Sequence, residues 1–537
     1  MTAITALAVC VMAVTIVLAV LALVSRHRAV IAQHEAVVAK QAAVRRQKQA
    51  EGLVGFMLGN LSDKLDQVHR LDIMQAVDDK AMAYFNSLPT ADATDASLAM
   101  RAKALEKIGD VRFESGHTAA ALKASQAASA IDAELLRRDP GNVTRLAEYA
   151  NGLNWIGNDD WYLGDLGGAG NAFKTASNLL TKAVAARPGD TDLANKLASA
   201  LVNTGRVLEA RGDYAAAKPY YDAVLKVYAG LSKREPGKTI WQTDLGDAYG
   251  DLGKVALEQG RLGVAITKYG INQRIQAQLA KQDPRDHNQA WELVQINGIL
   301  GRTLLLAGET TGAERYLRGA VDGAEALTHF DATVTDWQYL YARYSEQLGG
   351  VLRQTRQLDK AAAVDAHSLR ELRALVAKDP HDTEWQQELV ASELESARLA
   401  LDQNRADAAS TLTASAMNVL ARLQAKSPKD HNLLLLAAQA HIVAGQAAAK
   451  RGDVASAHEY WQQGEQIITP IATASNDVNV VATWANILLE LGDTKAAEPI
   501  IARLEAAGYR APDFVALTAA KRVGFAPKRI AMDASHP

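Results

Sequence analysis

Residues 188–236 read PGDTDLANKLASALVNTGRVLEARGDYAAAKPYYDAVLKVYAGLSKREP and contain one full unit of the repeat that decides the fold. The unit recurs every 48 residues and is marked by prolines in one register: Pro140, Pro188, Pro236, Pro284, Pro380 and Pro428, with Ala332 interrupting the series. Proline ends a helix because it lacks an N–H and clashes with the preceding turn. The Asp, Asn or Thr residues that follow can cap the next helix. The register therefore predicts where helices end and begin.

Small residues repeat with the same 48-residue period. One register holds Gly109, Gly157, Gly205, Gly253, Gly301, Gly349 and Gly445, with Ala397 as its exception. A second holds Gly116, Gly164, Gly212, Gly260, Gly308 and Gly452, broken by Arg356 and Asn404. A third, unbroken register holds Ala121, Ala169, Ala217, Ala265, Ala313, Ala361, Ala409 and Ala457.

These registers have different physical roles. The second glycine breaks the chain between two helices, whereas the first glycine and the alanine let two helix backbones approach closely. Apolar residues between the breakers follow helical spacing, as in Leu193, Leu197, Leu201 and Leu208. Each unit is thus a helical hairpin that must stack on its neighbours to hide its apolar face.

The spacing of small and aromatic residues resembles the tetratricopeptide repeat, over roughly residues 98–507. One unit provides Gly157, Gly164, Ala169, Phe173 and Ala176, and the next provides Gly205, Gly212, Ala217 and Tyr221. The usual period of that family is 34 residues, so these helices are expected to be about two turns longer. The predicted fold is all-α: a right-handed α-solenoid of about nine helical hairpins, behind one transmembrane helix.

The amino-terminal segment predicts a membrane anchor. Residues 2–24 carry no charge, and as a helix they span roughly 33 Å, enough for a hydrocarbon core of about 30 Å. A cleaved signal peptide is the rival reading, but no basic region precedes the apolar run. Residues 1–50 carry six Lys/Arg and one acid, Glu35, and Arg26, Arg28 and Lys40 follow the apolar run. The positive-inside rule therefore places the carboxyl side in the cytoplasm.

Residues 26–89 form the juxtamembrane part. The composition of residues 25–58 predicts that the membrane helix continues through them. A heptad trace at Val30, Val37 and Val44 is consistent with a homodimer, and a solvated single helix is the alternative. The block at 50–89 resembles the membrane-anchored repeat half of bacterial signalling proteins that carry TIR-like, winged-helix or kinase effector domains. The resemblance rests on Glu51, Phe56, Met57, Leu58, Leu61, Lys64, Leu65, Arg70, Leu71, Asp72, Asp79, Lys80, Tyr84 and Phe85.

That resemblance implies a bacterial inner-membrane protein whose repeats face the periplasm, against the Lys/Arg count. It leaves two readings of the chain: a stand-alone anchor with repeats, or the part downstream of a lost effector domain. The expected organisation is a transmembrane helix (1–25), a juxtamembrane block (26–89), a repeat array (90–507) and a carboxyl-terminal tail (508–537).

The sequence contains no recognisable catalytic set. The glycines of residues 164–170 fall on the turn between two helices and do not form a phosphate-binding loop. The acids are spread along helix faces, and the net charge of −3 gives no reason to expect nucleic acid. We therefore expect no enzyme activity, cofactor or metal.

The resemblance also places a partner site. In tetratricopeptide arrays the first helix of each unit lines a concave groove, and the residue after the first register glycine faces it. Here that row is Asn158, Arg206, Lys254, Arg302, Gly350, Arg398 and Gln446. Four cations in such a row suit a protein or peptide with an acidic segment or a C-terminal carboxylate. The alternative is that Glu209 and Glu258 offset them on a solvated face.

The expected function is a membrane-anchored, tetratricopeptide-like scaffold that mediates protein–protein interaction in bacterial signalling. The alternative is a structural assembly factor for an envelope complex.

Overall fold

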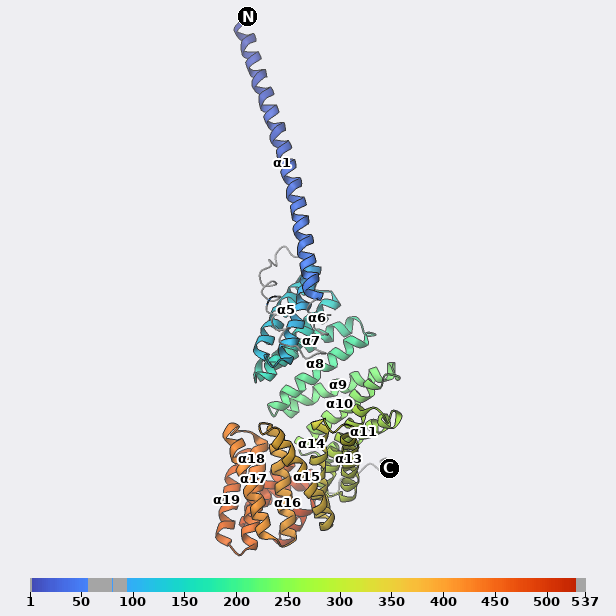
Figure 1. Ribbon diagram of the computed structural model, residues 1–537, viewed down its shortest axis with the longest axis vertical. Helices are drawn as coiled ribbons and strands as arrows, with labels where there is room; N and C mark the ends of the chain where they lie inside the picture. Colours follow the sequence, from blue (N-terminus) through green and yellow to red (C-terminus); the bar gives the residue numbers. More distant parts are fainter. Residues whose placement is uncertain (1, 57–79, 81–93, 528–537) are drawn as a thin grey trace. The chain divides into compact units, whose positions relative to one another are not determined.

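The computed structural model describes residues 2–56, 80 and 94–527, and its regular elements are all helices (Figure 1). No strand occurs in these ranges. Most of the block at 50–89 and residues 528–537 lie outside the described residues. The chain divides into two compact units, residues 1–203 and residues 204–537.

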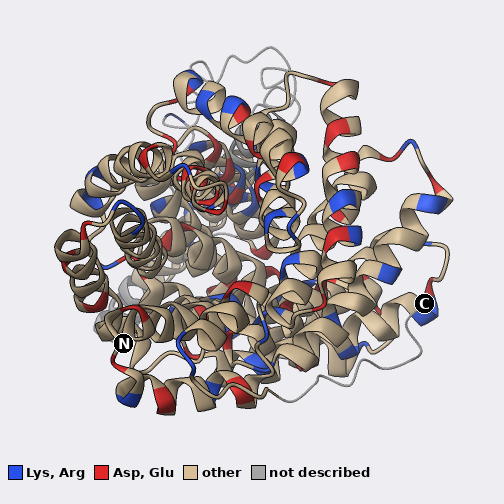
Figure 2. Cartoon of the chain, turned by 90° about the horizontal axis from the view of Figure 1, so that it is seen from below, with Lys and Arg blue, Asp and Glu red and all other residues tan. Residues whose placement is uncertain are grey.

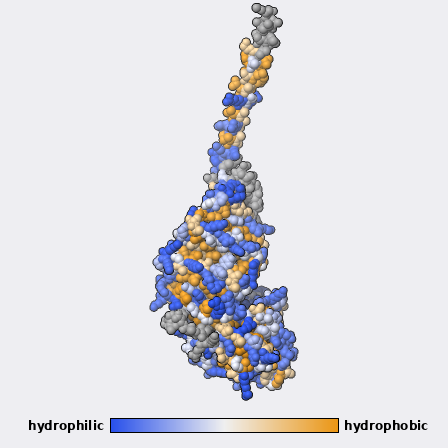
Figure 3. All heavy atoms as spheres, turned by 180° about the vertical axis from the view of Figure 1, so that it is seen from behind, coloured by the Kyte–Doolittle hydropathy of each residue, from blue (hydrophilic) through white to orange (hydrophobic). Residues whose placement is uncertain are grey.

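Helix α1 (Thr2–Phe56) is continuous for 55 residues. The described apolar side chains from Met12 to Val24 are exposed, and Figure 3 shows them as an apolar zone followed by a hydrophilic one. Residues 12–42 are long and apolar enough to cross a membrane, which is compatible with a single-pass span or a signal sequence. Helix α18 (His431–Lys450) also meets this test of length and composition, but most of it is buried among other helices.

The repeat array follows the predicted period. The first helices of the units start 48 residues apart and each contains 20 residues: α4 (Asp95–Glu114), α6 (Val143–Tyr162), α8 (Thr191–Ala210), α10 (Thr239–Glu258), α12 (His287–Leu306), α14 (Thr335–Gln354), α16 (Thr383–Asp402) and α18 (His431–Lys450). The second helices are α5 (Thr118–Arg138), α7 (Leu166–Ala186), α9 (Tyr214–Arg234), α11 (Leu262–Gln282), α13 (Thr310–Phe330), α15 (Leu358–Lys378), α17 (Ala406–Lys426) and α19 (Val454–Ala472).

A shorter pair, α20 (Val478–Leu491) and α21 (Thr494–Ala507), completes nine consecutive hairpins in residues 94–527, and α22 (Pro512–Ala520) follows. The predicted solenoid of about nine hairpins is therefore confirmed. Within each of the two compact units consecutive helices pack against each other. In residues 94–186 these are α4 with α5, α5 with α6 and α6 with α7, and in residues 214–507 they are the consecutive pairs from α9–α10 to α20–α21.

The small-residue registers act as predicted. All eight alanines of the third register have 0% exposure. In five units the first-register glycine faces a bulky residue of the second helix: a Cβ on Gly253 would lie 2.7 Å from the Tyr269 ring, and one on Gly205 would lie 2.7 Å from the Tyr221 ring. Because the glycine has no side chain, the aromatic ring packs directly against the backbone of the first helix and holds the two helices close together.

The turn between the two helices of a unit requires a left-handed residue. The second-register glycines there have φ between 70° and 83°, and the two exceptions adopt the same conformation, with φ of 64° at Arg356 and 59° at Asn404. The turns at the proline register end in the expected caps, since Asn142, Asp286, Asp382 and Asp430 accept hydrogen bonds from the backbone N–H groups of the following helix.

Candidate functional site

The predicted row lies on the first helices, but its members differ in exposure. Arg206 on α8, Lys254 on α10 and Arg302 on α12 are exposed. Arg398 on α16 and Gln446 on α18 are half-buried, and Gly350 on α14 is buried. Asn158, on α6 in the amino-terminal unit, is half-buried. We call the surface formed by α10, α12, α14, α16 and α18, together with residues 204–210 of α8, the first-helix face.

The exposed cations of the row are only partly neutralised. The Lys254 ammonium lies 2.8 Å from Glu209 Oε2 on the preceding first helix, as the solvated-face alternative expects. Within residues 204–527, no carboxylate lies within ion-pair distance of the Arg206 or Arg302 guanidinium. These two cations therefore have no direct ion-pair partner in this range. Burial raises the pKa of Asp251 and Asp477, and the charge of Arg206 opposes this rise at Asp251, as that of Arg302 does at Asp477.

The first-helix face also carries an acidic stripe on α10, which the sequence analysis missed. Asp244, Asp247, Asp251 and Glu258 are spaced so that they share one side of the helix. Burial raises the pKa of Asp247 and Glu258 to about 7 and that of Asp244 and Asp251 to about 6. Acidic and basic residues thus interleave along the helices (Figure 2), and the face has no single sign of charge.

The repeat departs from its own pattern around α14–α17. The two non-glycine turns, at Arg356 and Asn404, close these two hairpins. Asp365 occupies a position that holds a large hydrophobic residue in five other units and a small hydroxyl residue in two: Phe173, Tyr221, Tyr269, Leu317 and Trp461, and Ser125 and Thr413. It faces Gly349 closely enough to leave no space for a Cβ there, yet it is only 4% exposed.

The Asp365 carboxyl has no hydrogen-bond partner on either oxygen. Burial, reinforced by the Glu395 charge and opposed by Arg353, raises the pKa of Asp365 to about 8. A carboxyl group that costs stability stands where the other units have a hydrophobic or hydroxyl side chain, and such departures from a local rule mark candidate functional sites.

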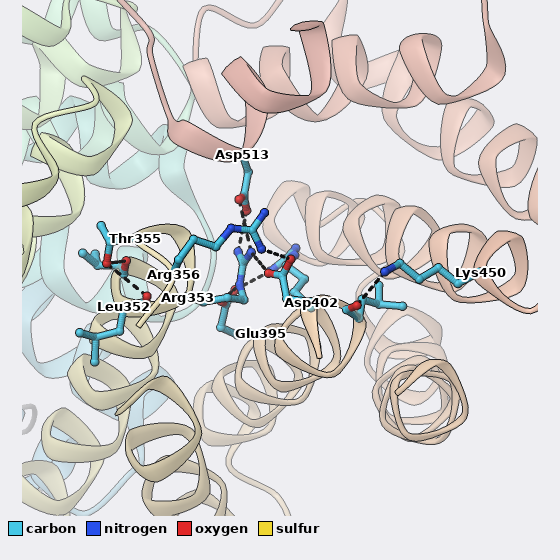
Figure 4. Close-up of polar contacts among 11 residues, drawn as sticks. Leu352, Arg353, Thr355, Arg356, Glu395, Asp402, Lys450 and Asp513 are labelled. Carbon is cyan, nitrogen blue, oxygen red and sulfur yellow. Dashed lines mark hydrogen bonds and ion pairs between the residues drawn. The ribbon is translucent and has the colours of Figure 1, made fainter. Parts of the chain in front are cut away.

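Beside Asp365, three carboxylates converge on Arg353 at the last turn of α14 (Figure 4). The Arg353 side chain is 5% exposed. Its Nε donates to Glu395 Oε1 at 2.5 Å and its Nη1 donates to Asp402 Oδ2 at 3.1 Å, both on α16. Nη1 and Nη2 donate to Asp513 Oδ1 and Oδ2 at 3.3 and 2.6 Å. All of the guanidinium nitrogens therefore have a carboxylate partner.

Further charged groups extend this network. The Arg398 guanidinium donates to Glu395 Oε2 at 3.2 Å, so one carboxylate bridges two arginines. Burial alone would raise the pKa of Glu395, but Arg353 and Arg398 hold it below its usual value. Arg343 Nε lies 3.6 Å from Glu388 on the neighbouring first helix. Ion pairs between α14 and α16 thus tie two units together.

The carboxyl-terminal helices cover part of the first-helix face. The Arg510 backbone N–H donates to Leu306 O at 2.7 Å, at the end of α12. A Cβ on Gly308 would lie 2.8 Å from Arg510 O, and one on Gly260 would lie 2.9 Å from Asn476 O, so both glycines permit this approach. Side chains of α20, α21 and α22 join the hydrophobic core formed by α10–α14.

No group of three or more His, Cys, Asp or Glu residues among the described ranges could hold a metal ion. The charged residues found together are Arg–carboxylate pairs, which bind and orient other charged groups.

No family model matches the sequence, and no curated protein matches it. The structure is similar to solved helical repeat proteins. The apo form of RapI is 11% identical, with a TM-score of 0.45, over 76% of this chain and 96% of that one. The apo quorum sensor NprR from B. thuringiensis is 10% identical, with a TM-score of 0.43, over 80% and 99%.

A tetratricopeptide repeat protein from Parabacteroides merdae is 13% identical, with a TM-score of 0.31, over 63% of this chain and 98% of that one. These neighbours are TPR-like helical repeat proteins. The fold of the present chain is established by its own helices and their 48-residue spacing, a helical repeat array in which consecutive hairpins stack.

Proposed function

We propose that the chain is a membrane-anchored scaffold without catalytic activity, whose first-helix face binds a segment of another protein. The observation that carries this proposal is the exposure of Arg206, Lys254 and Arg302 at equivalent positions of three consecutive first helices. Stacked units repeat such positions at a regular interval, so an extended segment meets one cation per unit. A single isolated surface arginine would carry no such expectation.

The partner chemistry follows from the charges on this face. Arg206 and Arg302 favour carboxylates, because a guanidinium forms strong charge-assisted hydrogen bonds with them. The acidic stripe on α10 lies between these two arginines in sequence and disfavours further acids beside it. The proposed partner is therefore an acidic segment or C-terminus whose carboxylates are spaced to meet the two arginines, not a uniformly acidic chain.

The proposal places the scaffold in bacterial signalling, with residues 2–24 retained in the inner membrane and the repeats in the periplasm. The length and exposure of the apolar part of α1 support the anchor. Protease treatment of spheroplasts tests the topology: loss of the repeats to external protease is expected, and full protection would place them in the cytoplasm.

Binding is tested with the full chain in detergent and a short fluorescent oligoglutamate peptide at low salt. We expect Arg206→Ala and Arg302→Ala each to weaken binding by about fivefold to tenfold, as for the loss of a charge-assisted contact. Arg285→Ala is the matched control, because Arg285 lies in the same compact unit, residues 204–537, on the turn before α12, and its side chain is 94% exposed. Equal effects of all three variants would mean that general charge attraction accounts for the binding, and absence of binding would remove the basis of the proposal.

A further inference from the structure

The three carboxylates on Arg353 have different origins. Glu395 and Asp402 belong to α16, which stacks directly on α14 as part of the repeat array. Asp513 is 160 residues away in sequence and reaches Arg353 from the first turn of α22. It makes the bidentate contact, with Oδ1 on Nη1 and Oδ2 on Nη2. One of the three carboxylates therefore comes from outside the stacked hairpins.

The segment that carries Asp513 is short and contacts the array through a defined set of residues. Helix α22 is nine residues long and buries Phe514 and Thr518. Tyr509 and Ala511 before it are also buried. The Arg510 N–H donates to Leu306 O, and Lys521 pairs with Glu490 at 2.8 Å. The Asp513 side chain is 51% exposed although its partner is buried. The Phe514 ring packs against Tyr509 and Phe525 with centroids 5.6 and 5.2 Å apart, and both of these residues belong to the same terminal stretch.

Departure of this segment would leave Arg353 incompletely satisfied. The guanidinium would keep Glu395 and Asp402 but lose both bonds to Asp513. A buried charged donor without its acceptor is costly, so the vacated position favours any carboxylate that can reach it. Bidentate geometry makes the preference specific for a planar carboxylate over a single acceptor atom.

The residue beside the carboxylate defines the rest of the site. Phe514 directly follows Asp513, is 3% exposed, and belongs to the same hydrophobic core as Leu306 and Leu352. The chain therefore provides its own ligand with two parts. The Asp513 carboxylate binds Arg353, and the neighbouring Phe514 ring packs in the hydrophobic core.

We propose that residues 508–527 are a displaceable internal ligand, and that the Arg353 site binds a partner segment that presents a carboxylate next to an aromatic side chain. This inference rests on the proposed scaffold function and names a second contact on the first-helix side of the array. The terminal segment competes with the partner for the same guanidinium, so binding at Arg353 requires α22 to detach.

The chain's own segment is the probe. A fluorescent peptide with the sequence of residues 508–527 is titrated against the full-length protein in detergent, against Asp513→Asn, and against the double variant Asp513→Asn with Phe514→Ala. The chain's own residues 508–527 compete with the peptide at full strength in the wild-type protein, and this competition is weakened in the two variants. We expect the double variant to bind the peptide about tenfold or more tightly than the wild-type chain does. A peptide that itself carries Asp513→Asn is expected to lose that affinity.

Hydrogen exchange without peptide gives an independent readout. Residues 508–527 of Asp513→Asn are expected to exchange faster while α14 and α16 keep their protection, which shows that the array remains folded. Glu314→Gln is the control, because the Glu314 carboxylate contacts Arg318 at 2.8 Å and Gln357 at 3.0 Å but neither Arg353 nor residues 508–527. Equal peptide affinity for all variants, or unchanged exchange of residues 508–527, would overturn the inference. Either result leaves the oligoglutamate test at Arg206 and Arg302 unaffected, so failures of the two proposals are distinguishable.

Discussion

Replacement of Asp365 by leucine should stabilise the protein, although Asp365 is a buried ionisable residue next to the Arg353 network. The substitution is sterically reasonable because Leu317 occupies the equivalent position on α13, where it is 0% exposed and packs against Gly301. Neither oxygen of Asp365 has a hydrogen-bond partner. Leucine would fill the same site without a polar group to satisfy.

The size of the effect follows from the ionisation of the carboxyl. Burial raises the pKa of Asp365 to about 8, whereas an unfolded aspartate titrates near about 3.9. At about pH 7 folding must therefore protonate the group, which costs up to about 4 kcal/mol at roughly 1.4 kcal/mol per pH unit. Buried unsatisfied polar groups typically cost about 1–3 kcal/mol, and we expect Asp365→Leu to raise the free energy of unfolding by this smaller amount.

The sign of the pH dependence is a second test of the same reasoning. Between about pH 4 and about pH 8 the folded state binds a proton that the unfolded state has lost, so wild-type stability falls as pH rises. Leucine does not titrate, and its advantage over aspartate should widen from about pH 5 to about pH 8.

Local hydrogen exchange in α14 and α15 at increasing urea is the appropriate assay, because long repeat arrays need not unfold in one step. Asp365→Asn is the isosteric control and should remove the pH trend. The reasoning is refuted if the leucine variant is less stable than wild type at about pH 8, or if the difference between them does not change with pH.

Three further outcomes are expected. Arg356→Gly should raise the thermal midpoint, because it removes a left-handed non-glycine residue costing about 1–2 kcal/mol and loses only an exposed pair with Asp402 worth about 0–1 kcal/mol; a lower midpoint would contradict this. Ala217→Leu should overpack a helix pair and cost about 1–3 kcal/mol, since Ala217 is 0% exposed, and an unchanged midpoint would mean that the pair can separate freely. Burial raises the pKa of Asp247 and Glu258 to about 7, so these folded carboxyls hold protons that the unfolded chain loses above about pH 4. The midpoint in differential scanning fluorimetry should therefore fall from about pH 5.5 to about pH 8, and a midpoint that rises over this range would be inconsistent with their burial.

The repeat was predictable because its constraints are local and recur. A turn that needs a left-handed residue selects glycine, and a helix pair in close contact selects alanine, so both appear as registers in the sequence. The exceptions were equally visible: Arg356 and Asn404 break one register, and both keep the backbone conformation of the glycines they replace. The 48-residue spacing also set the helix boundaries of eight units.

The charged network was not predictable from residue types. Arginine is normally exposed, and Arg353 is buried only because α16 and α22 both reach it. The contact with Asp513 joins residues 160 positions apart, and no local pattern encodes where a terminal helix returns. The nearest signal was Asp365, an acid in a register otherwise dominated by large apolar side chains.

The row of cations lies on the first helices, but its surroundings could be described only from the structure. Glu209 neutralises Lys254 from the preceding unit, and the acidic stripe on α10 lies on the same helix as Lys254. The Glu209–Lys254 ion pair and the surroundings of the acidic stripe depend on how neighbouring helices align. The position of a residue within the repeat does not determine this alignment. Whether Arg206 and Arg302 bind a partner stays a prediction.

Hydrogen exchange of the full-length protein with and without oligoglutamate peptide tests most directly whether the first-helix face is the binding surface. Binding should increase protection in α10 and α12 and leave the second helices α11 and α13 unchanged. Protection confined to α11 and α13, or no protection anywhere in residues 204–527 at saturating peptide, would contradict the account.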